Sequence, residues 1–230
     1  MNSKKTILLI LSAFFILLSA TVQAKKQELP DVTVDGLHRV PDSKLAVVYA
    51  EPGADLGPYN RVLLVEAGVA FKKNWERDQR RSSVSSIRLS SNDIERIKKT
   101  LADEFHVVFK NALQEAGYEL ADEAAEDVMI VRPAIINLDV TAPDTMSAGR
   151  SRSYTSSAGE MTLYIELYDS ISGDIIAKAL DRKFDRNAGY YTWASSVSNK
   201  AAADRILKGW AEILVNALNE AKAYDADEDS

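Results

Sequence analysis

The chain has 230 residues, with 34 Asp and Glu against 28 Lys and Arg, so its formal net charge is −6 at pH 7. This acidic balance argues against a nucleic-acid-binding protein, whose electrostatic footprint is basic. The absence of cysteine excludes disulfides, thiol nucleophiles and cysteine-ligated zinc.

The first 24 residues have the pattern of a secretory signal. Lys4 and Lys5 precede an apolar run from Ile7 to Leu18, and small residues at Val22 and Ala24 form a cleavage site. The run is too short for a comfortable membrane span. We therefore expect cleavage after Ala24 and a periplasmic protein with no integral membrane span. No cysteine is present at the cleavage site, so we expect no lipid anchor there and predict that the protein is not a lipoprotein.

Residues 25–60 are predicted to form an irregular lead-in, because prolines and glycines recur throughout this stretch. A short apolar stretch within it, residues 45–49, is expected to lie against the body. Residues 61–71 (RVLLVEAGVAF) are apolar and rich in β-branched side chains, which predicts a strand. The next segment, residues 72–91, is basic in an otherwise acidic chain.

Residues 92–116 carry apolar side chains at three- and four-residue steps, which predicts an amphipathic helix. Asn92 and Glu95 resemble a capping box at its start. Gly117 is the expected stop, because glycine adopts a left-handed cap without strain.

A second strand is predicted over residues 127–140, with Pro133 marking an edge or a bulge. Residues 160–169 alternate between apolar and polar side chains, which is typical of a half-buried strand. Residues 170–174 (SISGD) form the turn of a hairpin whose returning strand is 175–184. A last helix is expected from Asn199, followed by a frayed acidic tail at 223–230.

The order β-α-β-β-β-α predicts a single α/β (α+β) domain over residues 61–222. We expect one mixed sheet of about four to five strands with two main helices packed on one face. The strand–helix–strand unit makes the first two strands parallel. Following the chain from there, the polar segments 72–91, 141–159 and 185–198 gather at one end with both helix N-termini, whose free N–H groups favour anions.

This end carries the candidate binding residues. Arginines offer bidentate contacts to carboxylate or phosphate groups, and aromatic rings offer stacking or anchoring. The candidates are Arg80, Arg81, Arg150 and Arg152 for charge, and Tyr191 and Trp193 for contact. The alternative is that the arginines of the basic segment pair with the protein's own acids, such as Asp78, Asp139 and Asp144. In the same alternative, 141–159 is a flexible hairpin connection, and one or two of the aromatic side chains fold back over the sheet end.

Nothing in the sequence indicates catalysis. There is no G-x-S-x-G elbow for a Ser–His–Asp triad. Glu160 and Glu166 share a strand face, but six residues along a strand is about 20 Å, too far for a glycosidase pair. His38 and His106 are well separated and form no metal-ligand cluster with the scattered acids. We therefore expect no enzymatic activity, no cofactor and no metal.

Three stretches are similar to a known family: YAEPGADLGPYNRVLLVEAGVAFKKNWERD, VRPAIINLDVTAPDTMSAGRSRSYTSSAGEMTLYIELYDSISGD and WASSVSN. Over roughly residues 35–218 the chain resembles a bacterial envelope family catalogued as domain of unknown function 3313. The resemblance implies no activity and no catalytic residues. Many members look like lipoproteins with a lipobox cysteine, which this chain lacks. More loosely, the element order is similar to the TolB N-terminal domain and to lipoprotein activators of penicillin-binding proteins, a likeness of fold only.

The sequence thus predicts a non-enzymatic periplasmic binding or accessory domain that contacts an anionic envelope ligand or a protein partner, and no nucleic acid. Two alternatives stay open: a hydrolase acting on a cell-wall polymer, and a structural or assembly subunit that pairs through a sheet edge. The oligomeric state is left open.

Overall fold

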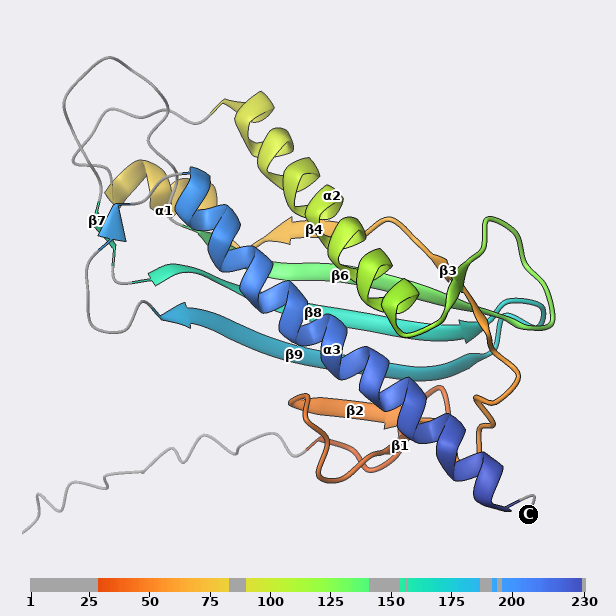
Figure 1. Cartoon of the computed structure of the whole chain (residues 1–230). Helices are drawn as coiled ribbons and strands as arrows, with labels where there is room; N and C mark the ends of the chain where they lie inside the picture. The colour runs from red at the N-terminus through yellow and green to blue at the C-terminus, as the bar shows by residue number, and fades with distance from the viewer. Residues whose placement is uncertain are drawn as a thin grey trace, which may run out of the picture. The chain divides into compact units, whose positions relative to one another are not determined.

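The computed structural model of the chain describes residues 29–82, 90–140, 154–155, 157–186, 192–193 and 196–228 (Figure 1). Residues 31–230 form one compact unit. Its strands are β1 (His38–Arg39), β2 (Val47–Ala50), β3 (Arg61–Leu64), β4 (Gly68–Phe71), β5 (Glu119–Leu120), β6 (Val128–Val140), β7 (Tyr154–Thr155), β8 (Ser157–Asp169), β9 (Ile175–Arg186) and β10 (Thr192–Trp193). Its helices are α1 (Trp75–Ser82), α2 (Ser91–Glu115) and α3 (Ser196–Glu228).

The predicted mixed α+β class is confirmed, but the expected number of strands was too small. The main sheet has eight strands in the order β1-β2-β9-β8-β6-β3-β5, with β4 also paired to β6. A separate two-stranded pairing joins β7 to β10. The predicted hairpin of β8 and β9 is antiparallel, as expected. Figure 1 shows α2 and α3 crossing the same face of the sheet.

The missed strands are short and lie in segments of poor strand pattern. The predicted strand over 61–71 is two strands, β3 and β4, which both pair with β6 in parallel, as the crossover rule required. The lead-in contains β1 and β2, and β2 pairs with β9 through the register Val47↔Leu180. The apolar stretch at 45–49 therefore does lie against the body, as an added strand.

Pro133 was expected at an edge or a bulge, and it lies at neither. β6 is an inner strand with β3 and β4 on one side and β8 on the other. The carbonyl of Val131 accepts the Val65 N–H at 2.9 Å, so the backbone of Pro133, two residues on, faces the same side. The missing N–H of Pro133 thus faces the break between β3 and β4, where no ladder bond is needed. The irregularity of β6 lies further on, where Asn137 has φ 53°.

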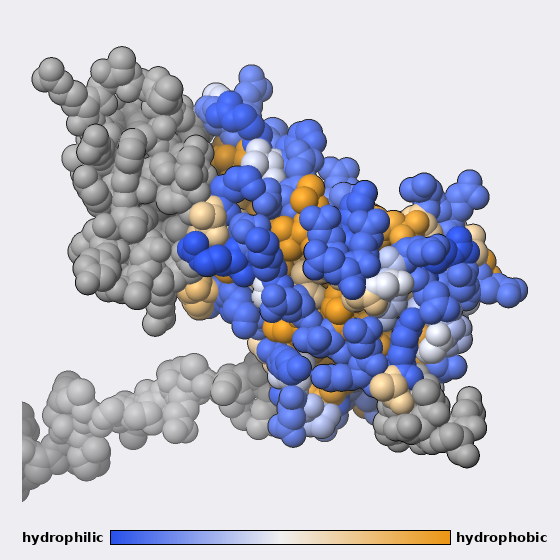
Figure 2. All heavy atoms as spheres, in the orientation of Figure 1, coloured by the Kyte–Doolittle hydropathy of each residue, from blue (hydrophilic) through white to orange (hydrophobic). Residues whose placement is uncertain are grey.

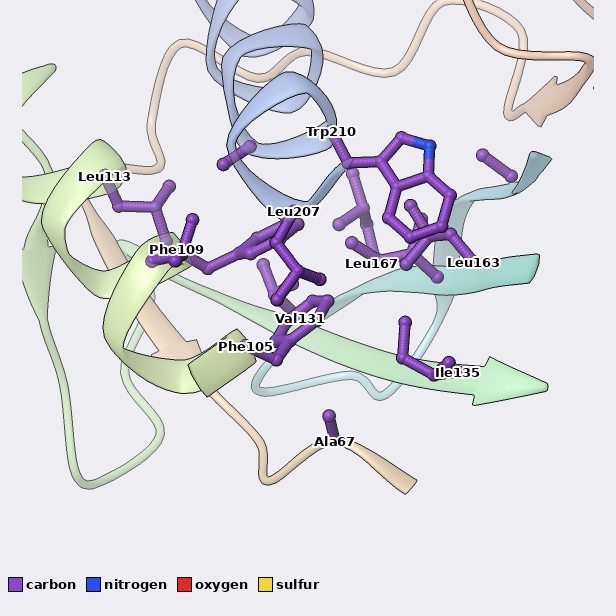
Figure 3. Close-up of a cluster of buried hydrophobic side chains, with 14 of the residues drawn as sticks. Ala67, Phe105, Phe109, Leu113, Val131, Ile135, Leu163, Leu167, Leu207 and Trp210 are labelled. Atoms are coloured by element: carbon purple, nitrogen blue, oxygen red, sulfur yellow. The ribbon is translucent and has the colours of Figure 1, made fainter. Parts of the chain in front are cut away.

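The core forms between the sheet and the two long helices (Figure 3). The expected apolar face of α2 is buried, and Phe105 stacks on Phe109 with ring centroids 3.8 Å apart. α3 adds Leu207 and Trp210. On β8, the predicted inward set is buried as well: Met161, Leu163, Ile165 and Leu167. The period-two pattern therefore assigned the buried face of this strand correctly.

The helix ends differ from the expected ones in detail. α2 begins with a capping box of Ser90 and Asp93, two residues before the predicted pair, and Gly117 ends it at φ +91° as expected. α3 begins at Ser196 instead of Asn199, and its backbone stays helical to Glu228, into the segment expected to fray.

A buried carboxylate joins three parts of the fold. Asp181 on β9 is 4 % exposed, and its Oδ2 accepts the indole N–H of Trp210 at 2.7 Å. Its Oδ1 accepts the backbone N–H of Ala46, in the lead-in just before β2, at 3.1 Å. Lys183 lies 3.1 Å from the same carboxylate. Because a buried charge is stable only when it is paired, Asp181 fixes α3 and the lead-in to the sheet.

The outer surface of the helix layer is that of a solvated face. Figure 2 shows mostly hydrophilic side chains over it, with small hydrophobic areas between them. Within the described ranges, no helix combines the length and the apolar character that crossing a membrane requires.

Candidate functional site

The strand registers bring together the ends of the strands that were predicted to meet at one end of the sheet. Phe71 at the end of β4 is opposite Leu138, and Val140 at the end of β6 is opposite Gly159 of β8. Ser157 is in turn opposite Arg186, the last residue of β9. Figure 1 shows the N-terminal ends of α2 and α3 at this same end of the sheet, on the left of the view. We call it the loop end.

The structure places only the backbone of some of the predicted binding residues. Arg80 and Arg81 lie on α1, and Trp193 lies on β10, opposite Tyr154 of β7. Their side chains are outside the described part of the chain. Arg150, Arg152 and Tyr191 lie outside the described residues altogether. Whether these six side chains share a site therefore stays a prediction.

The described start of the basic segment, residues 72–82, contains a helix where the sequence suggested a loop. Asn74, in the left-handed region at φ 66°, turns the chain from β4 into α1. Trp75 follows and is 3 % exposed. Its indole N–H donates to the carbonyl of Val140 at 3.0 Å, and its ring stacks on Phe71 with centroids 4.0 Å apart. These contacts fix the start of α1 against the ends of β4 and β6.

A hollow of about 680 Å³ opens beside this anchor. It lies between β4, α1 and the first turns of α2. Its lining residues are Val69, Ala70, Phe71, Lys72, Asn74, Trp75, Glu76, Arg77, Ile94 and Lys98. The lining thus combines apolar and aromatic side chains with three cations and one carboxylate.

The cations of the hollow are held by exposed pairs. Lys72 lies 2.8 Å from Asp139, and this hydrogen bond raises the pKa of Lys72. Arg77 pairs with its neighbour Asp78 at 3.1 Å. The alternative predicted from the sequence, pairing of the arginines with the protein's own acids, therefore holds at Arg77, and Lys72 forms a pair of the same kind. Exposed pairs of this kind contribute only about 0–1 kcal/mol, so the carboxylate of a ligand can replace them at little cost.

Lys98 is the cation that the sequence did not single out. It lies on α2 and pairs with Glu95, one turn earlier, at 2.8 Å. No sequence signal marks it, because a lysine on a charged helix face is ordinary. Its position beside the hollow depends on how α2 crosses β4, which only the three-dimensional structure shows.

The N-terminus of α2 is already occupied by the chain itself. The Asp93 carboxylate accepts the backbone N–H of Ser90 at 3.0 Å, and Ser90 Oγ accepts the Asp93 N–H at 3.2 Å. The Ser90 hydroxyl also donates to Asp93 Oδ2 at 2.7 Å. This bond is the largest cause that holds the pKa of Asp93 below its usual range, and the Ser90 N–H and Arg96 add to it. The expectation that this terminus favours an external anion is therefore weakened.

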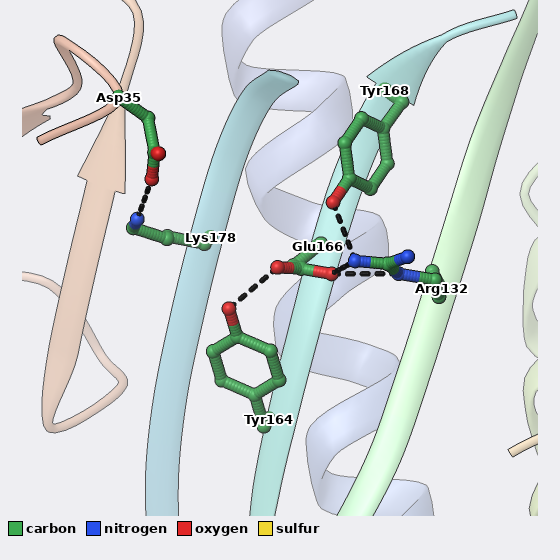
Figure 4. A network of polar contacts seen from close by, with 6 residues as sticks. All are labelled: Asp35, Arg132, Tyr164, Glu166, Tyr168 and Lys178. Carbon is green, nitrogen blue, oxygen red and sulfur yellow. Dashed lines mark hydrogen bonds and ion pairs between the residues drawn. The ribbon is translucent and has the colours of Figure 1, made fainter. Parts of the chain in front are cut away.

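A second polar cluster lies on the sheet face opposite the helices (Figure 4). Glu166 of β8 accepts a hydrogen bond from Arg132 Nε at 2.7 Å and another from the Tyr164 hydroxyl at 2.5 Å. Arg132 also donates to the Tyr168 hydroxyl at 2.7 Å. Nearby, Lys178 forms an ion pair with Asp35 of the lead-in.

This cluster is balanced in charge. Burial alone would raise the pKa of Glu166, but hydrogen bonds from Tyr164, Arg132 and Tyr168 hold it below its usual range. Burial and the Glu166 carboxylate raise the pKa of Tyr164. Glu160, the other carboxylate of the predicted strand face, forms an ion pair with Arg182. Both glutamates are thus bound to arginines, and the cluster presents no excess charge to a ligand.

No metal site appears in the described parts of the chain, where no three His, Cys, Asp or Glu side chains are grouped to hold an ion.

Comparison with known proteins identifies a family. A family model described as protein of unknown function (DUF3313) matches residues 32–214. No curated protein matches the chain. Among solved structures, the chain is similar to XCC0632 of Xanthomonas campestris, a DUF330 protein, with 13% identity over 77% of this chain and 93% of that one, at a TM-score of 0.39.

Two further structures are similar at the same low level. A neuraminyllactose-binding hemagglutinin homolog from Helicobacter pylori has 11% identity over 76% of this chain and 92% of that one, at a TM-score of 0.42. The PelC dodecamer from Paraburkholderia phytofirmans has 13% identity over 70% of this chain and 94% of that one, at a TM-score of 0.34. At these TM-scores the likenesses carry no argument about function.

Proposed function

Because this chain belongs to the DUF3313 family, whose function is unknown, we propose its function from its own geometry. It is a non-enzymatic binding or accessory protein of the bacterial envelope. It holds an anionic ligand or an acidic protein partner in the hollow at the loop end. The observation that carries this proposal is the hollow itself, whose lining has three cations, Lys72, Arg77 and Lys98, and one carboxylate, Glu76. The acids that pair with the three cations lie outside the lining, and these pairs are solvent-accessible, so a ligand can replace them.

The structure of the lining supports binding in two ways. Its aromatic wall is rigid, because Trp75 is held by both Phe71 and the Val140 carbonyl. Lys72 and Arg77 are exposed, Lys98 is half-buried, and all three are weakly paired, so they can turn to a ligand. A rigid apolar wall beside movable charges is the combination that gives small sites both shape and orientation.

The setting of the proposal is the periplasm. The signal pattern of residues 1–24, with cleavage after Ala24 and no cysteine there, supports export without a lipid anchor. Cell fractionation tests this: the mature protein is expected in the periplasmic fraction. Recovery only in detergent extracts of membranes would overturn it.

Charge reversal at the hollow tests the binding function. We expect tripolyphosphate, an acidic peptide in which valine alternates with aspartate or glutamate, or both to bind the mature protein by calorimetry at low salt. Lys98→Glu is expected to weaken this binding by about tenfold, since a repulsive charge replaces an attractive one. Lys99→Glu is the matched control, because Lys99 is the next residue of α2, pairs with Asp103 and does not line the hollow.

Two results would contradict the proposal. One is the absence of saturable binding for both probes. The other is an equal loss in Lys98→Glu and Lys99→Glu, which would assign the effect to overall charge. Thermal unfolding of both variants checks that the fold is retained.

A further inference from the structure

The strand position beside β3 and β4, on the side away from β6, is only half occupied among the strands that the structure describes. β3 and β4 lie end to end along the same side of β6, β3 beside Val128–Val131 and β4 beside Ala134–Leu138. In the strand position outside them, β5 pairs with β3 at Arg61 and Val62. None of the described strands pairs with the outer edge of β4.

The hollow lies along that edge. Four consecutive residues of β4 and its end, Val69 to Lys72, line it. Successive side chains of a strand point to opposite faces, so four consecutive lining residues place the hollow along the backbone edge. α1 and α2 supply the other walls.

The register shows which backbone groups face the hollow. The N–H of Lys72 donates to the Leu138 carbonyl of β6 at 3.0 Å. Between Val69 and Phe71 the extra residue of the bulge is on β6, since their partners are Ile135 and Leu138, so β4 itself is regular. By the two-residue period, the N–H and C=O groups of Val69 and Phe71 then point away from β6, into the hollow.

Proteins often block such an edge with a lysine. Lys72 is not placed for that purpose, because its ammonium group is turned back to Asp139 of β6 at 2.8 Å. Arg77 and Lys98 instead line the hollow from the two helices, and Ile94 gives its wall an apolar part.

We propose that an extended polypeptide segment of alternating apolar and acidic residues adds as a strand to the outer edge of β4. The inference rests on the proposed function and names its partner class. Main-chain hydrogen bonds to Val69 and Phe71 hold the segment, and its apolar side chains pack on Phe71 and Ile94. Its carboxylates alternate with them, and the three cations that line the hollow favour their negative charge. This is recognition by strand addition, in which the backbone gives affinity and the side chains give specificity.

The test changes the peptide and leaves the protein intact. The probe is an acetylated and amidated hexapeptide of sequence Val-Asp-Val-Glu-Val-Asp, with two N-methylated forms, one methylated at residues 1, 3 and 5 and the other at 2, 4 and 6. In an added strand, alternate N–H groups face β4 and the others face away. One methylated form should therefore lose at least tenfold in affinity, while the other stays within about threefold of the parent peptide.

Amide exchange by NMR gives the second readout. The N–H groups of Val69 and Phe71 should exchange quickly in the free protein and slowly with saturating peptide. Two methylated forms that bind as well as the parent would overturn strand addition. Slow exchange at these amides in the free protein would also overturn it, since a strand of the chain itself or of a second copy would then already pair with β4.

The two proposals fail in different ways. If tripolyphosphate or the parent peptide binds with the expected loss in Lys98→Glu but methylation has no effect, the anion-binding function stands and the strand addition falls. If neither probe binds, both fall.

Discussion

Trp210→Phe tests whether the buried carboxylate of Asp181 ties the fold together. Trp210 is 1 % exposed, and its indole N–H is one of three partners of that carboxylate. Phenylalanine keeps an aromatic ring but has no donor. Losing a hydrogen bond to a charged group costs about 1.5–3 kcal/mol. The lost part of the indole adds about 1 kcal/mol of apolar burial. The free energy of unfolding should therefore fall by about 3 kcal/mol.

Urea denaturation of the mature protein measures this change. With a slope of about 3 kcal/mol per molar, expected for a chain of this size, the midpoint should fall by about 1 M at an unchanged slope. A double-mutant cycle with Asp181→Asn isolates the bond. In the Asp181→Asn background, Trp210→Phe should cost at least about 1 kcal/mol less than in the native background.

The reasoning is refuted if Trp210→Phe costs less than about 1 kcal/mol, or if its cost is the same with and without the Asp181 carboxylate. The first result would mean that other groups satisfy the carboxylate in the variant. The second would mean that the loss comes from packing alone.

Further predictions concern two glycines and the carboxylate of Asp169. Gly117→Ala should destabilise the protein by about 1 kcal/mol, because Gly117 has φ +91° and alanine is strained there even though no atom lies within 4 Å of its added Cβ. Gly209→Ala, in α3 and also with open space, should instead stabilise it by about 0.5–1 kcal/mol, and thermal denaturation compares the two. The Ser172 N–H and the Tyr59 hydroxyl hold the pKa of Asp169 below its usual range, so the ionised carboxylate stabilises the fold above about pH 4 and this effect is lost as the pH falls further. Asp169→Asn should therefore be less stable than the native protein at pH 6, with the gap narrowing at pH 2.5 in urea titrations; a gap independent of pH would contradict this assignment.

The sequence predicted the helices and strands whose apolar residues recur with a regular period. The apolar spacing in α2 and the alternation in β8 assigned both elements and their buried faces. The parallel relation of β3 and β4 to β6 followed from the handedness of a single crossover. The position of the ends of β4, β6 and β9 at one end of the sheet followed from counting strand directions, which needs no knowledge of side-chain contacts.

What the sequence did not predict depends on pairing between distant residues. β1, β2 and β5 are two to four residues long and have no pattern of their own. They are strands only because a neighbour with matching backbone groups lies beside them. The same holds for the candidate site: Arg77 belongs to a visibly basic segment, but Lys98 joins it through the crossing of α2 over β4.

The pairing of β2 with β9 constrains the order in which the chain can fold. Val47 meets Leu180, so this part of the sheet closes a loop of more than a hundred residues, and such contacts form late because the loop entropy is lost before the contact stabilises it. A chain that appears N-terminus first must hold its lead-in unpaired until residues 175–186 are available. With the periplasmic location that we propose, this delay is an advantage, since a chain that crosses the membrane unfolded completes its sheet only after nearly all of it has reached the far side.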